Sequence, residues 1–286
     1  MPQATVTSVI KNPQDMQRRA AALSREGKSI GFVPTMGALH AGHKSLVERA
    51  RKENDIVVVS IYVNPTQFGI GEDFTKYPRT FDSDLKICTE AGADIVFAPE
   101  NLYEPGVRTY VEVGELGDVL CGISRPGHFR GVATVVTKLL NIVHPDRSYF
   151  GKKDAQQLVV IHTIVRDLNI PGEIVGCDII RDADGLALSS RNRYLSATER
   201  RQALALHKSL EYCKFRIREG ERDAMKLMEG MAEILQQQPD LEIDYVALVD
   251  ANTLVDLKTL EGDVLVAVAA KVGTTRLIDN TQFEGL

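Results

Sequence analysis

The chain has 286 residues, of which 44% are hydrophobic and 26% charged, and this composition is typical of a globular protein rather than a disordered or fibrous one. Its formal net charge of -5 gives no general attraction to phosphate backbones, so nucleic acid is not an expected partner. Because no basic segment followed by an apolar stretch opens the chain, and no apolar run approaches the roughly 20 residues of a membrane span, we expect a cytoplasmic protein with no membrane partner.

The first 180 residues alternate between expected helices and expected strands. Asn12 and Pro13 predict the start of a helix and Gly27 its end, and the apolar run Ser29–Val33 predicts a strand. Then follow, in chain order, a helix over 43–53, a strand over 55–63, a helix over 81–91, a strand over 94–97, a helix over 131–143, a strand over 148–150 and a helix over 155–168. This alternation predicts an α/β fold with a doubly wound parallel sheet.

The pattern changes after residue 180. A turn at 182–185 is followed by two long charged segments expected as helices, 197–219 and 223–238, and by two apolar runs expected as strands, 243–249 and 264–268. No crossover helix is evident between these two strands, so we expect a smaller α+β domain. The sequence thus predicts a larger domain over residues 1–180 and a smaller C-terminal domain over residues 181–286.

A histidine-containing segment lies between an expected strand and the helix after it, and it reads Pro34-Thr35-Met36-Gly37-Ala38-Leu39-His40-Ala41-Gly42-His43. In an open α/β sheet this end of a strand is where ligands bind, and N–H groups at a helix start attract phosphate. Two histidines three residues apart can donate to the same phosphates, so we expect them to stabilise charge on a pentavalent α-phosphate and on departing pyrophosphate. In the alternative interpretation, one histidine caps the helix and the other is a surface residue.

Two further clusters carry groups suited to phosphate. Phe150–Gln157 lies at another expected strand end, where lysine supplies a mobile positive charge and glutamine can bind a hydroxyl or carboxylate. Leu188–Asn192 offers hydroxyls and a guanidinium on a loop that can close over a triphosphate. Each alone could be an ordinary helix start or an interdomain linker, but three such clusters in one chain favour a nucleotide site.

Two segments are expected to contact a second substrate. Asn64–Phe68 follows a Val/Ile-rich strand, so Asn64 and Gln67 should face the carboxyl edge of the sheet. Arg125–Val132 precedes a helix and contains two arginines and His128. Either segment could instead be a tight turn packed on the sheet.

Together these segments resemble the pantothenate synthetase family, the pantoate:β-alanine ligases, and the matching stretches are G-F-V-P-T-M-G-A-L-H-A-G-H, Y-V-N-P-T-Q-F, Y-P-R-T, R-P-G-H-F-R-G-V-A-T-V-V, F-G-K-K-D-A-Q-Q and L-S-S-R-N. They occur in the family's order between Gly31 and Asn192. H-x-G-H alone would indicate only the wider nucleotidyltransferase superfamily, whereas the full set is specific to this ligase family.

The resemblance implies a Rossmann-like nucleotidyltransferase domain, a C-terminal domain that acts as a lid, and a homodimer. It also implies a two-step reaction. ATP and pantoate give pantoyl adenylate and pyrophosphate, and β-alanine then attacks the adenylate to give pantothenate and AMP. Magnesium (Mg²⁺) accompanies the ATP.

The resemblance assigns roles to matching residues. The catalytic set would be His40, His43, Lys153 and Arg191; Gln67 and Gln157 would hold pantoate, with Gln67 also near β-alanine. ATP would contact Met36, Gly37, Ala38, Leu39, His40, Ala41, Gly42, His43, Gly151, Lys152, Lys153, Asp154, Ile180, Leu188, Ser189, Ser190 and Arg191. Further site positions would be Pro34, Thr35, Asn64, Tyr77, Arg125 and His128, and Asp82 and Asp84 would be candidate Mg²⁺ ligands.

Other functions remain open on the sequence alone. A nucleotidyltransferase of another kind would keep the nucleotide in its product, whereas the ligase releases AMP. A non-catalytic nucleotide-binding or sensor module would bind ATP without releasing pyrophosphate. A tRNA synthetase would be expected to carry additional tRNA-binding domains and a basic surface.

Overall fold

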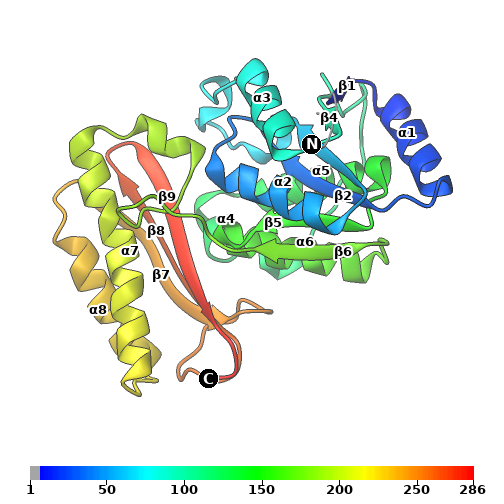
Figure 1. Cartoon of the computed structure of the whole chain (residues 1–286). Helices are drawn as coiled ribbons and strands as arrows, with labels where there is room; N and C mark the ends of the chain where they lie inside the picture. The colour runs from blue at the N-terminus through cyan, green and yellow to red at the C-terminus, as the bar shows by residue number, and fades with distance from the viewer. Residues whose placement is uncertain (1–6) are drawn as a thin grey trace. The chain divides into compact units, whose positions relative to one another are not determined.

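The computed structural model describes residues 7–286, and the chain forms two compact units (Figure 1). The first comprises the described residues up to Gly117, together with Arg125–Lys152 and Val160–Asp178. The second comprises Asp118–Ser124, Lys153–Val159 and Ile179–Leu286. The predicted division at residue 180 stays a proposal.

The first unit is built on a six-stranded sheet in which every neighbouring pair of strands is parallel. The strands are β1 (Ser8–Ile10), β2 (Ile30–Thr35), β3 (Ile56–Ile61), β4 (Ile95–Phe97), β5 (Arg147–Gly151) and β6 (Glu173–Cys177), and their order across the sheet is β1-β4-β3-β2-β5-β6. The chain therefore runs from β2 outward through β3 and β4, then returns to the other side of β2 with β5 and β6. This reversal makes the carboxyl ends of β2 and β5 the expected ligand-binding crevice.

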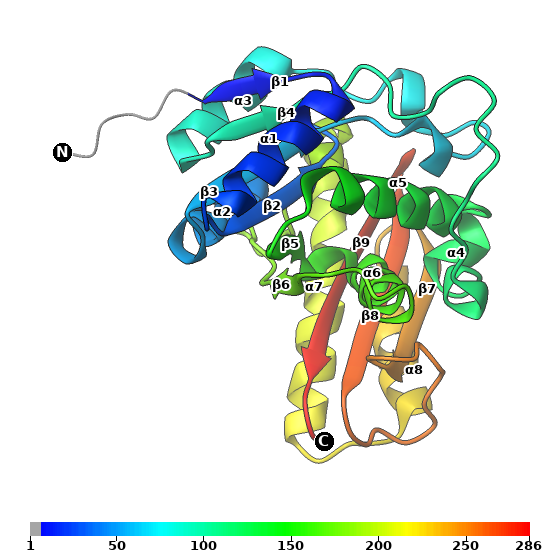
Figure 2. The same ribbon diagram turned by 90° about the vertical axis from the view of Figure 1, so that its right-hand side faces the viewer.

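Helices cover both faces of this sheet, with α2 packed beside α3 and α1 beside α5 (Figures 1 and 2). Their bounds are α1 (Pro13–Arg25), α2 (Ala41–Glu53), α3 (Phe81–Ala91), α5 (His128–Val143) and α6 (Ala155–Asp167). Val57 and Val59 on one face of β3 pack with Val47 and Ala50 of α2 in a fully buried cluster. This burial fixes the direction of α2, whose first residues follow the end of β2.

The second unit has a three-stranded antiparallel sheet covered by two helices. The strands are β7 (Leu241–Asp250), β8 (Val264–Val272) and β9 (Thr275–Phe283), and the helices are α7 (Ala197–Arg218) and α8 (Ala224–Gln236); the short helix α4 (Cys121–Ser124) also belongs to this unit. Ser196 and Glu199 form a capping box that begins α7. Leu210 and Leu227 of the helices pack with Val266 of β8 in the core.

The predicted fold class is confirmed: a parallel α/β sheet is followed by a smaller antiparallel α+β unit. The helix predicted over 81–91 has the observed bounds of α3, and the other predicted elements differ by a few residues at their ends. Three strands were not predicted, namely β1, β6 and β9. β1 has only three residues, and β9 carries consecutive polar residues from Asp279 to Gln282, so neither has the apolar pattern of a buried strand.

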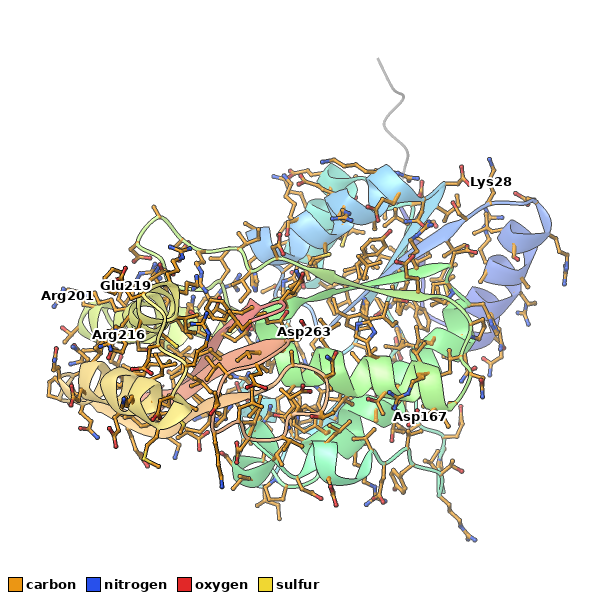
Figure 3. The ribbon with its side chains drawn as sticks, turned by 90° about the horizontal axis from the view of Figure 1, so that it is seen from below. Lys28, Asp167, Arg201, Arg216, Glu219 and Asp263 are labelled. Atoms are coloured by element: carbon orange, nitrogen blue, oxygen red, sulfur yellow. The ribbon has the colours of Figure 1, made fainter. Side chains whose placement is uncertain are left out.

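The surfaces carry charges of both signs. Lys28 and Asp167 are exposed on the first unit, and Arg201 and Glu219 on the second (Figure 3). Among the residues described, no helix combines the length and hydrophobicity needed to span a bilayer.

Candidate active site

The histidine segment lies where the sequence predicted it. β2 ends at Thr35 and α2 begins at Ala41, so the loop Met36–His40 leaves the carboxyl end of the strand at which the sheet order reverses. Gly151 ends the neighbouring strand β5, and Lys152 follows it. The first unit therefore presents the histidine loop and the start of the lysine cluster at one edge of the sheet, as ligand sites in such sheets require.

His40 and His43 lie against each other at the start of α2, with ring centroids 4.1 Å apart. His40 is the N-cap residue, and its Nδ1 accepts from the Gly42 N–H at 3.2 Å; Nδ1 of His43 accepts from the His40 N–H at 3.4 Å. Because Nδ1 is an acceptor in both rings, the neutral form of each ring carries its proton on Nε2. The capping alternative thus holds for His40, which caps α2 through Nδ1.

Three backbone N–H groups of the loop that precedes α2 donate to side chains of the protein. The Gly37 N–H donates to Thr35 Oγ1 at 3.1 Å, and the Ala38 and Leu39 N–H groups donate to Asp84 Oδ2 and Oδ1 at 3.0 and 2.8 Å. These donors are satisfied within the protein. These three N–H groups therefore hold the loop in place rather than pointing to a ligand.

The two aspartates predicted to bind Mg²⁺ differ in their surroundings. Asp82 is exposed, whereas Asp84 is 1% exposed and its carboxylate is directed at the loop Met36–His40. Across residues 7–286, no three His, Cys, Asp or Glu side chains form a group that could hold a metal ion. Asp84 does not fit the role of a metal ligand, because its oxygens already accept hydrogen bonds.

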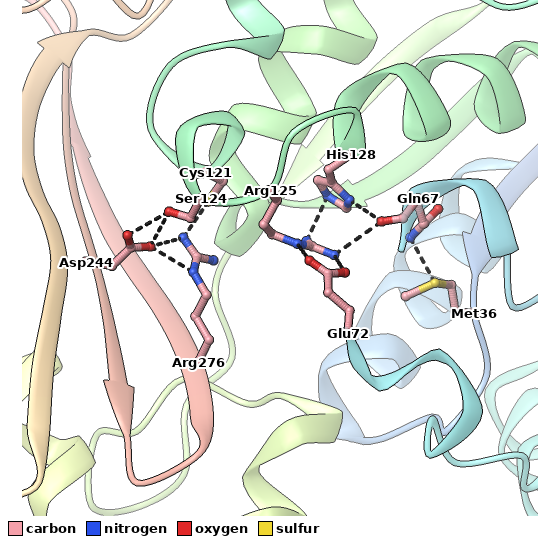
Figure 4. Close-up of polar contacts among 9 residues, drawn as sticks. All are labelled: Met36, Gln67, Glu72, Cys121, Ser124, Arg125, His128, Asp244 and Arg276. Atoms are coloured by element: carbon pink, nitrogen blue, oxygen red, sulfur yellow. Dashed lines mark hydrogen bonds and ion pairs between the residues drawn. The ribbon is translucent and has the colours of Figure 1, made fainter. Parts of the chain in front are cut away.

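Gln67, predicted to read pantoate, is held beside the histidine loop (Figure 4). Gln67 Nε2 lies 2.9 Å from Met36 Sδ. Asn64 Nδ2 donates to Gln67 Oε1 at 3.0 Å and to the carbonyl of Gly131 at 3.1 Å. Asn64 is 1% exposed and Gln67 7% exposed, so both amides are fixed by the surrounding side chains. The structure thus brings together Met36, Asn64 and Gln67, which lie apart in the sequence.

Arg125 and His128 join the same network (Figure 4). Arg125 forms two hydrogen bonds of 2.7 Å to the Glu72 carboxylate, and its Nη1 lies 3.0 Å from His128 Nε2. Nδ1 of His128 lies 2.8 Å from the Gln67 carbonyl, so this ring carries its proton on Nδ1. Arg125 Nη2 donates to the same carbonyl at 3.3 Å, so both residues hold the backbone of Gln67.

Sequence reasoning did not find Glu72. Burial alone would raise the pKa of Glu72, but the hydrogen bonds and charge of Arg125 hold that pKa below its ordinary value. Glu72 is separated from Arg125 by 53 residues, and its own segment contains no motif that matches a known site. The one available signal for Glu72 was that a half-buried arginine such as Arg125 requires an acidic partner.

A cavity of about 370 Å³ opens in the first unit beside the histidine loop. Met36, Gly37, Thr80 and Asp84 are among the residues that line it.

Two further predicted site positions are buried. Tyr77 is 5% exposed and packs edge-on against the Phe68 ring, with the ring centroids 5.9 Å apart. Thr35, another predicted position, is buried and its hydroxyl donates to the Ser60 carbonyl at 2.7 Å.

The lysine cluster divides between the two units. In the first unit, Lys152 Nζ lies 2.9 Å from Asp178 Oδ1. In the second unit, Lys153 has a side chain that is 18% exposed and lies 3.8 Å from Asp154, and its carbonyl accepts from Asn280 Nδ2 at 2.8 Å.

The glutamine pair that follows in the second unit has one buried and one half-buried member. Gln156 is 5% exposed, and its amide accepts from the Cys121 N–H at 3.0 Å and donates to the Val119 carbonyl at 2.7 Å. Gln157, which was predicted to hold pantoate, is half-buried. The amide of Gln156 therefore ties α6 to the segment that leads into α4.

Of the predicted adenine and triphosphate residues, Ile180 and Leu188 close a hairpin, and Ser190 and Arg191 lie on the 3-10 helix that follows it. The Leu188 N–H donates to the Ile180 carbonyl at 2.9 Å, and the Arg191 N–H donates to Ser189 Oγ at 3.3 Å. Arg181 anchors this hairpin to β9 through hydrogen bonds of 2.6 and 2.9 Å to Asp279. In the segment Leu188–Asn192, which the sequence predicted as a loop, a short 3-10 helix begins at Ser190, and closure of this segment stays a prediction.

A second polar cluster in this unit lies on β7, β9 and α4 (Figure 4). Arg276 donates to Asp244 at 2.6 Å, Ser124 Oγ donates to the same carboxylate at 2.6 Å, and Cys121 Sγ lies 3.4 Å from Arg276. These contacts tie the short helix α4 to the three-stranded sheet.

The chain matches a known protein family over nearly its whole length. A family model described as pantoate-beta-alanine ligase matches residues 8–282. The chain is 53% identical over 275 residues to the pantothenate synthetase of Thermotoga neapolitana, covering 96% of this chain and 98% of the relative. It is 54% identical over 266 residues to the pantothenate synthetase of Moorella thermoacetica, covering 92% and 94%.

Solved structures show the same similarity. The pantothenate synthetase of Thermus thermophilus matches with a TM-score of 0.91 and 44% identity, covering 96% of this chain and 99% of the other. A pantoate-beta-alanine ligase from Francisella tularensis, complexed with beta-gamma ATP and beta-alanine, matches with a TM-score of 0.77 and 34% identity, covering 96% and 97%. The similarity extends over nearly the full length on both sides.

Proposed function

The chain belongs to the pantoate-β-alanine ligase family, and on that basis we propose how its residues join pantoate to β-alanine. The enzyme is an ATP-dependent ligase that condenses the two substrates through a pantoyl adenylate and releases AMP and pyrophosphate. The observation that carries the residue assignment is the pair of histidine rings at the start of α2. Both rings use Nδ1 internally, which defines Nε2–H as the donor of each.

In the first step, a carboxylate oxygen of pantoate attacks the α-phosphorus of ATP and pyrophosphate leaves. Negative charge builds on the phosphate oxygens in the transition state, and fixed donors stabilise it because they need no reorganisation. We assign this role to Nε2–H of His40 and His43, and assign neutralisation of phosphate charge to Lys153 and Arg191. Holding pantoate in line with the α-phosphorus, a role for Gln67 and Gln157, adds an entropic advantage.

In the second step, the amine of β-alanine attacks the acyl carbon of the adenylate. The bond from that carbon to the bridging oxygen breaks, AMP leaves with the oxygen, and the amine loses a proton. Gln67 is the proposed contact for β-alanine. Since water would compete for the same acyl carbon, the site must exclude it until the amine arrives.

Further features of the family belong to the same proposal. Mg²⁺ would enter with ATP and offset phosphate charge. Asp84 is not assigned as one of its ligands. The unit that contains residues 181–286 serves as the lid, the molecule is a homodimer, and it acts in the cytoplasm.

The proposal is tested with purified protein, ATP, Mg²⁺ and pantoate, with and without β-alanine, by following pyrophosphate, AMP and pantothenate by mass spectrometry. Pantoate-dependent pyrophosphate, with equal amounts of AMP and pantothenate once β-alanine is added, is the expected result. A product that retains the nucleotide would instead indicate another nucleotidyltransferase. ATP binding without pyrophosphate release would indicate a binding module.

A further inference from the structure

The loop before His40 has a backbone conformation that must be stabilised by contacts from outside the loop. Gly37 and Ala38 have φ values of 82° and 52°, so two successive residues lie in the left-handed region. Glycine adopts this conformation readily, but a residue with a Cβ such as Ala38 adopts it rarely. Something outside the loop must therefore stabilise the conformation of Ala38.

Asp84 of α3 stabilises this conformation through hydrogen bonds to the loop backbone. Its Oδ2 accepts from the Ala38 N–H at 3.0 Å and its Oδ1 from the Leu39 N–H at 2.8 Å. The Thr80 hydroxyl lies 3.2 Å from each of the two oxygens, and the carboxylate is 1% exposed. The single Thr80 hydroxyl proton is shared between the two oxygens, so three donors take up most of the acceptor capacity of this buried carboxylate and direct it at the loop rather than at a metal ion.

The residues held by Asp84 directly precede the catalytic pair. Leu39 is followed by His40, whose N–H donates to Nδ1 of His43. A shift of Ala38 and Leu39 would therefore move the N-cap of α2 and, through that hydrogen bond, the second ring. The loop packs closely against Asp84 at Gly37 as well, since a Cβ at residue 37 would lie 3.0 Å from Asp84 Oδ2 and 3.2 Å from Ile61 Cγ2.

We propose that Asp84 is a positioning residue, which fixes the left-handed loop and thereby the Nε2–H donors of His40 and His43, and is not a Mg²⁺ ligand. This inference rests on the proposed function for the roles of the two histidines. The anchoring itself is a property of the loop and can be measured without substrate.

The main test is Asp84→Asn. An amide nitrogen cannot accept an N–H, so one loop donor loses its partner. Hydrogen exchange at Ala38 and Leu39 in the nucleotide-free protein should speed up at least about tenfold, and kcat for pyrophosphate release should fall at least about tenfold, while the Mg²⁺ concentration for half-maximal rate stays unchanged. Glu90→Gln, an exposed acidic residue on the same helix, should change none of these quantities.

A double variant separates anchoring from a general loss of structure. Adding Ala38→Gly to Asp84→Asn gives the loop a residue that enters the left-handed region without a Cβ, so part of the lost kcat should return. A second variant, Thr80→Val, removes only the hydroxyl beside the carboxylate. It should speed up hydrogen exchange at Ala38 and Leu39 by less than Asp84→Asn does, and it provides the test if Asp84→Asn does not fold.

Unchanged exchange at Ala38 and Leu39 in the Asp84 and Thr80 variants would overturn the proposal. So would an increase in the Mg²⁺ requirement of Asp84→Asn with loop exchange unaltered, because that pattern is the one a metal ligand gives. If the wild-type protein released no pyrophosphate with pantoate, the proposed function would fail, yet the exchange experiment would still decide the anchoring.

Discussion

In the proposed mechanism, His40 and His43 combine two tasks that usually belong to different side chains. His40 Nδ1 accepts from the Gly42 N–H in the first turn of α2, as a serine or aspartate would at an ordinary helix start, and His43 Nδ1 accepts from the N–H of the N-cap residue His40. Their Nε2–H groups have the donor character that a phosphate needs. An aspartate cap would place a negative charge beside the triphosphate, so histidine suits both the helix and the anionic substrate.

Replacing a phosphate-stabilising side chain should slow adenylation without unfolding the protein. We expect His43→Ala or Lys153→Ala to lower kcat for pyrophosphate release by about 10²-fold or more, because each removes a fixed donor from the transition state. Initial rates and circular dichroism measure the two effects. Lys52→Ala, at an exposed position on α2, is the matched control, and near-normal turnover in both site variants would exclude these roles.

Gly131 permits the close approach that fixes Gln67. A Cβ at residue 131 would lie 2.4 Å from the Thr66 carbonyl oxygen and 2.7 Å from Gln67 Cα, both backbone atoms. Gly131→Ala should therefore push this turn away, with a cost of about 1–3 kcal/mol in unfolding free energy.

The same substitution should lower kcat/KM for pantoate by about tenfold, since displaced contacts weaken positioning. Gly117→Ala is the control, because the nearest atom to its Cβ would be at an ordinary 3.6 Å. Equal kinetics and stability in both variants would show that the turn adapts without moving Gln67.

At the scale of elements, the hairpin over residues 180–188 depends on β9. Arg181 and Asp279 form a two-point ion pair in which the Asp279 side chain is 3% exposed. Asp279→Asn leaves a guanidinium without its charge partner and should cost on the order of 3 kcal/mol in unfolding free energy, with a raised KM for ATP.

Urea unfolding of the single and double variants tests this ion pair. Replacing both partners, as Arg181→Met with Asp279→Asn, should cost less than the sum of the two single changes, because no buried charge is left unpaired. Strict additivity would mean that the two side chains do not interact.

The same hairpin predicts a pH effect through His207, whose ring lies against Gly185. Burial, and then the charge of Arg181, hold the pKa of His207 below its ordinary value. The unfolded chain thus binds a proton more readily than the folded one, so stability falls as pH drops below the ordinary histidine pKa of about 6.5. Thermal unfolding from about pH 7 to about pH 5.5 should show this loss, and His207→Gln should flatten it; an equal slope in both proteins would refute the assignment.

Sequence patterns predicted helices and strands best where one face of the element, or the whole element, is buried in the core. The apolar run of β3 and the proline and asparagine at the start of α1 depend on local chemistry, and both were read correctly. β9 was missed because Asp279 and Asn280 are polar and yet buried, through partners at Arg181 and Lys153. Such contacts join residues far apart in the chain, and no local pattern reveals them.

The candidate site shows the same division. The positions of the histidine loop and of Asn64 and Gln67 followed from their place after strands. The role of Asp84 did not, because an acidic segment has the composition of a metal site whether its carboxylate faces solvent or the loop. The packing of α3, which buries Asp84 and exposes Asp82, is the observation on which the proposed positioning role of Asp84 rests.

At the scale of the whole molecule, the enzyme must convert a carboxylate oxygen into part of a leaving group. Adenylation does so by forming a bond between that oxygen and the α-phosphorus, and the oxygen then departs with AMP when the amine attacks. The most direct measurement uses pantoate labelled with ¹⁸O in its carboxylate, together with ATP, Mg²⁺ and β-alanine, and analyses the AMP by mass spectrometry. An adenylate intermediate predicts one ¹⁸O atom in each AMP; unlabelled AMP, or ADP and phosphate in its place, would contradict it.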